Sequence, residues 1–134
     1  MGIPTLNFPN ADADVICCVC QGVFETPVKL PACSHIFCMQ CITKWFEARN
    51  GPPTCPLCRA IVENRVTVPA DAETVALVGR QMIYCRQRIG GCREVMQLSE
   101  LEGHLLVCRY RHFFFLMIVI LLNFCFNFVL IKFP

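Results

Sequence analysis

The zinc-ligand residue types between residues 17 and 58 constrain this chain's fold more than any other feature. Their spacing reads Cys17-x2-Cys20-x12-Cys33-x-His35-x2-Cys38-x2-Cys41-x13-Cys55-x2-Cys58. Seven thiols and one imidazole are enough for two tetrahedral zinc sites, with no ligand left over. Because a site with four protein ligands leaves no position for water, we expect the metal to hold the fold and not to do chemistry.

Chain size and composition favour zinc over disulfides as the cross-link. The chain has 134 residues and twelve cysteines, and very small domains need cross-links because they bury little apolar surface. Residues 1–10 contain neither the basic cluster nor the apolar run of a secretory signal. Nothing therefore suggests the oxidising compartment in which disulfides form. The net charge of +2 is too small to indicate a nucleic-acid partner.

The first half of the chain has room only for short elements. Residues 1–14 are expected to be a flexible lead, because they are rich in proline, asparagine and aspartate. Residues 28–30 and 35–37 could pair as a small hairpin around Pro31. Residues 39–49 predict a helix with Ile42, Trp45 and Phe46 at helical spacing.

A linking helix is expected over residues 69–83. Asp71 is its predicted N-cap, and Val75, Val78 and Met82 would share one face. The simplest role for this helix is to pack back on the first zinc module.

A second metal pattern follows, with the spacing Cys85-x6-Cys92-x11-His104-x3-Cys108. Ser99 and Glu102 form a capping-box pattern, which predicts a helix on which His104 and Cys108 share a face. Gly90-Gly91 would be the turn of a hairpin that carries the other two ligands. We predict a third closed zinc site; the alternative is a buried thiol pair beside a surface histidine. Cys18 is expected to be a bystander, although it could exchange roles with Cys17.

Residues 17–59 resemble the RING finger of ubiquitin ligases in its C3HC4 form, and we place this module at residues 15–60. Ligands alternate in that family, so the resemblance implies a cross-brace. One site would be formed by Cys17, Cys20, Cys38 and Cys41, and the other by Cys33, His35, Cys55 and Cys58.

The resemblance also implies a docking surface for a ubiquitin-conjugating enzyme, made by Val19, Trp45 and Pro56. Arg59 matches the basic position that holds the ubiquitin-loaded conjugating enzyme ready for attack. Otherwise Val19 and Trp45 would be core residues, and Arg59 an ordinary exposed arginine.

The function implied is that of a RING-type E3 ubiquitin ligase. The conjugating enzyme would pass ubiquitin directly to a substrate lysine, with no covalent intermediate on this chain, and the ligase would act by positioning. The alternative is a non-catalytic zinc scaffold for protein assembly. Nucleic-acid binding through the arginines of residues 80–111 lacks support, because these arginines have no aromatic stacking platform among them.

Residues 84–110 resemble a TRAF-type zinc finger in Gly91-Cys92, the eleven-residue spacer and the His-x3-Cys ending. The expected fold is a small zinc-stabilised α+β fold, holding three zinc ions. It would consist of a cross-brace RING finger and a ββα-like TRAF-type finger, followed by a hydrophobic C-terminal helix.

That helix is expected from residues 113–131, which carry no charge, because about 20 apolar residues cross a bilayer. Basic residues precede the segment, which would place the zinc modules in the cytoplasm of a tail-anchored ligase. The segment has no alanine, glycine, serine or threonine, whereas spanning helices usually pack through such residues. A translated non-coding stretch that follows a truncated gene therefore remains the other interpretation.

Overall fold

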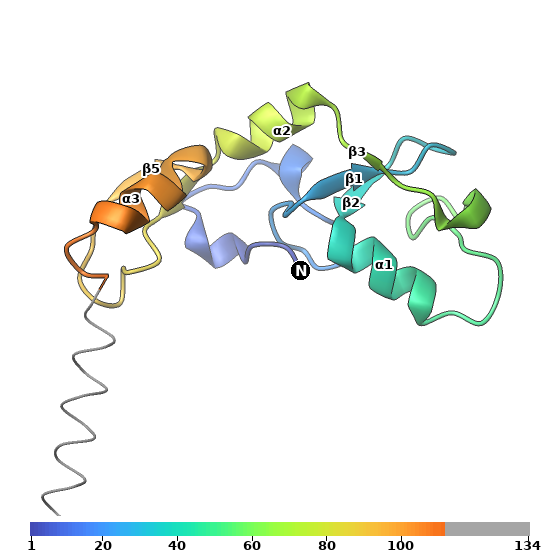
Figure 1. The fold of residues 1–134 in the computed structure, drawn as a ribbon, viewed down its shortest axis with the longest axis horizontal. Helices are drawn as coiled ribbons and strands as arrows, with labels where there is room; N and C mark the ends of the chain where they lie inside the picture. Colours follow the sequence, from blue (N-terminus) through green and yellow to red (C-terminus); the bar gives the residue numbers. More distant parts are fainter. Residues whose placement is uncertain (112–134) are drawn as a thin grey trace, which may run out of the picture.

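The computed structural model describes residues 1–111, which form two small modules side by side (Figure 1). The first module contains strands β1 (Pro27–Lys29), β2 (Ile36–Cys38) and β3 (Val68–Pro69) and helix α1 (Met39–Glu47). Helix α2 (Ala72–Gly79) leads to the second module, which contains β4 (Met82–Tyr84), β5 (Val95–Gln97) and α3 (Leu101–Val107). The short elements confirm the expectation of a small α+β fold.

The first module is built on a three-stranded antiparallel sheet in the order β2-β1-β3. The central β1 pairs Val28 with Phe37 on one side and with Pro69 on the other. Helix α1 buries Ile42 and Phe46, as its spacing predicted, while Trp45 remains half-buried. The predicted hairpin and first helix are therefore confirmed, except that α1 ends at Glu47 and not at residue 49.

The linking helix is shorter than predicted. Asp71 is its N-cap as expected, and its carboxylate accepts a hydrogen bond of 2.8 Å from the Thr74 N–H. The helix ends at Gly79, because glycine is a poor helix former and the next residues extend into β4. Only Val78 of the predicted face is buried; Val75 is 51% exposed and Met82 is 44% exposed.

The second module is a β4–β5 hairpin followed by a 3-10 turn (Leu98–Glu100) and α3. Its capping box involves Gln97 and Glu100, and not Ser99 and Glu102 as predicted. The Gln97 N–H donates to the Glu100 carboxylate at 3.1 Å. The cap begins two residues earlier because β5 ends at Gln97 and the chain turns there at once.

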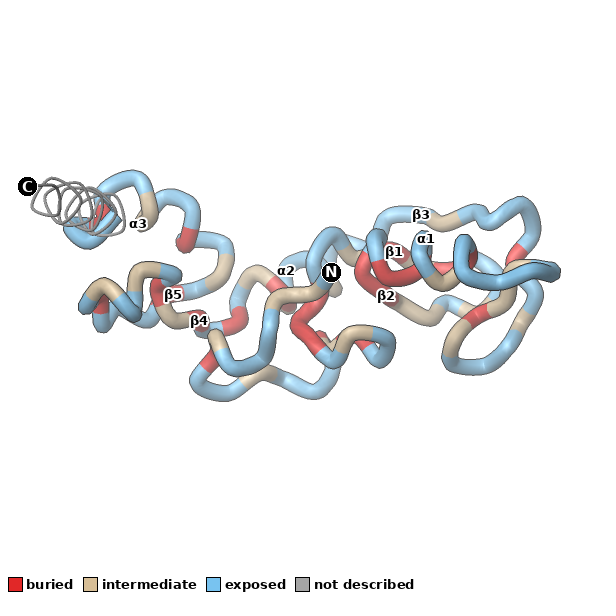
Figure 2. Tube along the Cα trace, turned by 90° about the horizontal axis from the view of Figure 1, so that it is seen from below, coloured by how far each residue is buried: buried red, intermediate tan, exposed pale blue. Residues whose placement is uncertain are grey.

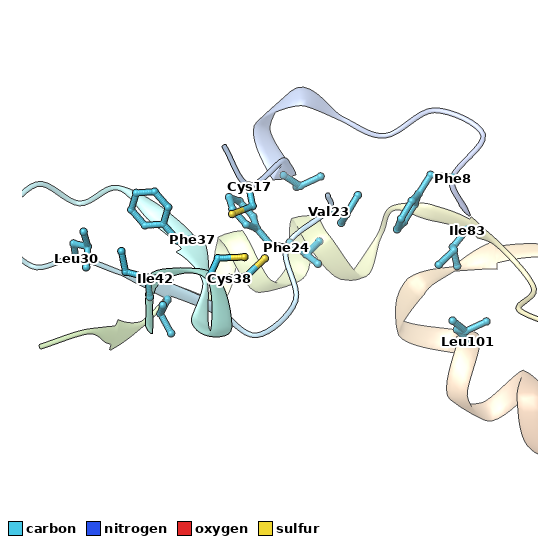
Figure 3. Close-up of a cluster of buried hydrophobic side chains, with 14 of the residues drawn as sticks. Phe8, Cys17, Val23, Phe24, Leu30, Phe37, Cys38, Ile42, Ile83 and Leu101 are labelled. Atoms are coloured by element: carbon cyan, nitrogen blue, oxygen red, sulfur yellow. The ribbon is translucent and has the colours of Figure 1, made fainter. Parts of the chain in front are cut away.

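Residues 1–15, which we call the strap, are packed against both modules and not free, in contrast to the flexible lead expected for residues 1–14. The strap runs from the first module toward the second and back (Figure 1). Ile3 and Val23 exchange two backbone hydrogen bonds, of 2.9 and 2.8 Å. Phe8, only 5% exposed, lies beside Ile83 of the second module (Figure 3). Burial of this ring outweighs the local preference of the prolines for an open chain.

Buried residues form one continuous core through both modules. In the tube view they run along the centre of the elongated molecule (Figure 2). The close-up follows the same cluster from Leu30 and Phe37, past Cys17 and Val23, to Phe8 and Leu101 (Figure 3). The strap supplies the side chain at the junction, so the two modules are joined by packing and not only by a linker.

The hydrophobic segment 113–131, predicted to be a membrane helix, lies outside the described residues. Within residues 1–111, none of the helices has the length and apolar character needed to cross a bilayer.

Candidate metal centres and docking groove

Twelve ligand-type side chains of the described chain gather into three groups of four. In each group the ligand atoms all lie within 4.8 Å of one another. The groups are Cys17, Cys20, Cys38 and Cys41; Cys33, His35, Cys55 and Cys58; and Cys85, Cys92, His104 and Cys108. The first two groups alternate along the chain, so each ties together segments that are distant in sequence.

The spacing of atoms within each group fits a tetrahedral zinc ion. With Zn–S bonds of about 2.3 Å, sulfur atoms around one ion lie about 3.8 Å apart. The Cys20 and Cys38 sulfurs are 4.0 Å apart, and those of Cys85 and Cys108 are 3.8 Å apart. No sulfur needs to move far for the ion to bind.

Each of the two histidines in these groups directs one identified ring nitrogen at the sulfurs around it. His35 faces the Cys55 sulfur through Nδ1 at 3.5 Å. His104 reaches the sulfurs of Cys85 and Cys92 through Nε2, at 3.2 and 3.6 Å. Neutral imidazole binds zinc through either nitrogen, so both histidines are suitable ligands.

Backbone amides support one sulfur in every group. The Glu25 N–H lies 3.3 Å from the Cys38 sulfur. The N–H groups of Leu57 and Gln87 lie 3.4 Å from the sulfurs of Cys55 and Cys85, each two residues earlier. Such donors orient a metal-bound thiolate and offset its negative charge.

Two of the three Cys-x2-Cys pairs of the first module, Cys17–Cys20 and Cys55–Cys58, lie in loops that we call knuckles, and these loops have the same backbone geometry. In the first knuckle, Gln21 N–H donates to Cys17 C=O at 2.7 Å, and Cys17 N–H donates to Gly22 C=O at 2.8 Å. In the second, Arg59 N–H donates to Cys55 C=O at 3.0 Å, and Cys55 N–H donates to Ala60 C=O at 2.9 Å. Each knuckle thus presents two sulfurs on one side in a fixed turn.

Neighbouring thiols and burial shift the pKa values of the cysteines in these groups. A hydrogen bond from the Cys38 thiol lowers the pKa of Cys17 to about 4, and the same bond raises the pKa of Cys38. Burial raises the pKa of Cys41 to about 11, and it does the same for Cys33 and Cys85 in the other groups. Zinc must displace these protons, so its affinity should fall as the pH falls.

The donor set therefore fits three zinc ions, in sites with no open position. Two groups of three thiols and one imidazole and one group of four thiols match the usual structural zinc ligands. The ions would cross-link the backbone and take no part in a reaction. The remaining described cysteine, Cys18, is exposed and belongs to none of the groups, as expected.

Val19 and Trp45 line the same shallow groove beside the first group. The groove lies between the first knuckle and α1, and its other lining residues include Gln40, Lys44 and Ala48 of the helix region and Met1 of the strap. Val19 is 39% exposed, so it is not a core residue. Pro56 and Arg59, on the second knuckle, are half-buried and exposed respectively and are not among the lining residues.

Two contacts that the sequence analysis missed orient Trp45. The indole N–H donates to the Thr54 carbonyl at 2.9 Å, which ties α1 to the segment just before the second knuckle. The Arg49 guanidinium carbon lies 4.2 Å from the centre of the indole ring, within cation–π range. The four-residue spacing of Trp45 and Arg49 in the predicted helix of residues 39–49 could have indicated this second contact.

Arg59 has a left-handed backbone conformation, with φ of +64°. Non-glycine residues adopt it at a cost of about 1–3 kcal/mol. Gln21, at the equivalent place in the first knuckle, has φ of +55°. The turn itself therefore demands this conformation, and glycine would satisfy it more easily at both positions.

Comparison with known proteins agrees with this geometry. Residues 15–59 match the family described as Ring finger domain. These residues are a RING finger. The described chain thus contains the expected RING finger, and its three Cys/His groups are consistent with three zinc ions in a RING finger and a TRAF-type finger.

The similarity to relatives extends well beyond the RING finger. The chain is 35% identical over 111 residues to human E3 ubiquitin-protein ligase NRDP1, which is 82% of this chain and 34% of that protein. It is 39% identical over 93 residues to bovine RING finger protein 151, covering 69% of this chain and 37% of the relative. Mouse E3 ubiquitin-protein ligase RNFT1 is 42% identical over 73 residues, which is 54% of this chain and 18% of that protein. The chain spans about a third of the length of the first two of these relatives.

Proposed function

We propose that this chain acts as a RING-type E3 ubiquitin ligase. The observation that carries the proposal is the apolar groove lined by Val19 and Trp45 on a zinc-stabilised RING finger. Two of its relatives, NRDP1 and RNFT1, are named E3 ubiquitin-protein ligases. A groove with exposed apolar side chains on so small a domain is a surface that a partner would cover. The proposed partner is a ubiquitin-conjugating enzyme charged with ubiquitin.

In this mechanism the chain holds the conjugating enzyme and its ubiquitin in position and supplies no nucleophile. The groove would hold the conjugating enzyme, while Arg59 on the second knuckle would donate hydrogen bonds to both the enzyme and its ubiquitin. The rigid fork of donors on arginine suits a bridge between two carbonyl-rich surfaces. Holding the thioester in a reactive arrangement lowers the entropic part of the barrier to attack by a substrate lysine.

The fixed side chains of the groove favour this role over free surface residues. Trp45 is held by the Thr54 carbonyl, and Val19 is held between Cys17 and Cys20, two members of the first zinc group. Preorganised side chains lose little entropy when a partner binds. The second zinc module, packed on the RING finger through the strap, would extend the surface toward a protein substrate.

The test is discharge of ubiquitin from a charged conjugating enzyme to free lysine. The zinc-loaded chain should accelerate this reaction with at least one member of a panel of conjugating enzymes. If the chain binds a conjugating enzyme but accelerates none, the non-catalytic scaffold is the better description. A chain that neither binds a conjugating enzyme nor accelerates ubiquitin discharge would contradict the proposal.

A further inference from the structure

The strap reaches the same groove as Val19 and Trp45. Met1 is one of the lining residues and is 67% exposed. Its nitrogen lies 2.5 Å from Gln40 Oε1 and 3.4 Å from a Glu25 carboxylate oxygen. The start of the strap is thus fixed at the edge of the groove, where its flexible apolar side chain can adapt to a partner.

Two glycines allow the strap to lie this close. A Cβ atom on Gly2 would be 2.7 Å from the Val23 carbonyl oxygen and 2.8 Å from the Cys20 sulfur. A Cβ atom on Gly22 would be 2.8 Å from the Ile3 carbonyl oxygen and 3.0 Å from the Gly2 carbonyl carbon. Real Cβ atoms do not approach so closely, so space and not backbone torsion requires glycine at both positions.

The other end of the strap is held by the second module. Phe8 packs beside Ile83 (Figure 3), and the Asp12 N–H donates to the buried side chain of Gln81 at 3.0 Å. Gln81 also accepts from the Leu98 N–H through its backbone carbonyl, at 2.9 Å. The strap therefore spans from the groove to the second zinc module.

We propose that residues 1–3 form a wall of the groove on which the conjugating enzyme docks. This inference rests on the proposed function, and it adds a part of the recognition surface that lies outside the matched RING finger of residues 15–59. The partner feature that fits is an apolar loop, which would contact Met1, Val19 and Trp45 together in the groove. Removing this wall should weaken docking while the zinc groups stay intact.

Gly22→Val tests the wall directly, because the nearest neighbours of the new side chain are strap backbone atoms. Gly103→Val is the matched control, since a Cβ at Gly103 on α3 meets nothing within 4 Å. The zinc-loaded full chain is titrated by calorimetry with the conjugating enzyme that gives the fastest discharge. The Ile3 and Val23 amides each donate a hydrogen bond to the other residue's carbonyl. The rate of hydrogen exchange at these two amides therefore reports whether the strap has moved.

Gly22→Val should weaken binding by about five-fold or more, whereas Gly103→Val should change it by less than about two-fold. Zinc content is measured for each variant and should stay at the parent value in Gly22→Val. Rapid exchange at Ile3 with parent affinity would overturn the inference. If the parent chain itself binds no conjugating enzyme, the proposed function fails and not the wall alone.

Discussion

At the scale of single residues, Arg59 separates a structural role from a functional one. Its left-handed backbone is a property of the knuckle, since Gln21 shares it in the other knuckle. Arg59→Gly should therefore leave stability equal to the parent or raise it by up to about 1 kcal/mol. Discharge of ubiquitin should nevertheless fall by about ten-fold or more, because the bridging donors are lost.

Gln21→Gly is the matched control for Arg59→Gly, because it changes the same backbone position in the first knuckle. It should keep the discharge rate within about two-fold of the parent. Thermal unfolding and single-turnover discharge are measured for both variants. Equal losses of activity in the two would show that the backbone matters and that the Arg59 side chain does not.

Trp45 is the residue whose removal should cost the most binding. Trp45→Ala should weaken affinity for the conjugating enzyme by about thirty-fold, as expected for a large aromatic side chain at the centre of an interface. Thr43→Ala, on the same helix, removes only a hydroxyl bonded to the Met39 carbonyl and should leave affinity unchanged. Calorimetry measures the affinity of each zinc-loaded variant for the conjugating enzyme. Parent-like affinity of Trp45→Ala would place the docking surface elsewhere.

At the scale of elements, the N-cap of α2 gives a prediction that is independent of function. Asp71→Ala should lower the thermal midpoint by a few degrees, because the Thr74 N–H loses its acceptor. Glu73→Ala, in the same turn, should not lower it.

The hydrogen bond from Thr74 also lowers the pKa of Asp71. This contribution is present above the unfolded-state pKa and is lost as the pH falls through the folded-state pKa. The difference between the variants should therefore vanish in acid, and a difference that persists there would contradict the assignment.

The elements differ in how far the sequence predicts them. Cysteine and histidine spacing identified the candidate ligands, and the resemblance to the RING family implied how the first eight divide into two alternating groups. Helix α1 was predicted because Ile42 and Phe46 have helical spacing with no competing signal. The strap was not, because the contact between Phe8 and Ile83 joins positions far apart in the chain. The same holds for Met1 in the groove, which no local pattern indicates.

Helix ends were predicted less well than helix existence. Asp71 was identified as a cap because its position before an apolar run is typical. Gln97 was missed because Ser99 and Glu102 satisfy the same pattern two residues later. The end of β5 decides between them, and that depends on pairing with β4.

At the scale of the whole molecule, the alternating ligands should make the first two zinc sites interdependent. Cys33→Ser removes one ligand of the second group. Because the ligands of the first and second groups alternate along the chain, both sites depend on the same stretch of polypeptide. Metal binding and folding are coupled in such small domains, so the variant should retain about one zinc ion, in the third group. Zinc is measured by atomic absorption after gel filtration.

Cys18→Ser is the control for this loss, because Cys18 is exposed and lies outside all three groups. It should retain as much zinc as the parent chain. A Cys33→Ser chain that kept the first site fully loaded would show that the two sites are independent, contrary to the interleaved arrangement.

The account as a whole depends on a zinc-built surface that positions a charged conjugating enzyme. The most direct measurement is the single-turnover rate of ubiquitin discharge to free lysine, with the chain zinc-loaded and after its zinc has been removed by a chelator. The zinc-loaded chain should accelerate discharge, and the metal-free chain should return the rate to that of the conjugating enzyme alone. A zinc-loaded chain that leaves the rate unchanged across the panel of conjugating enzymes would contradict the account.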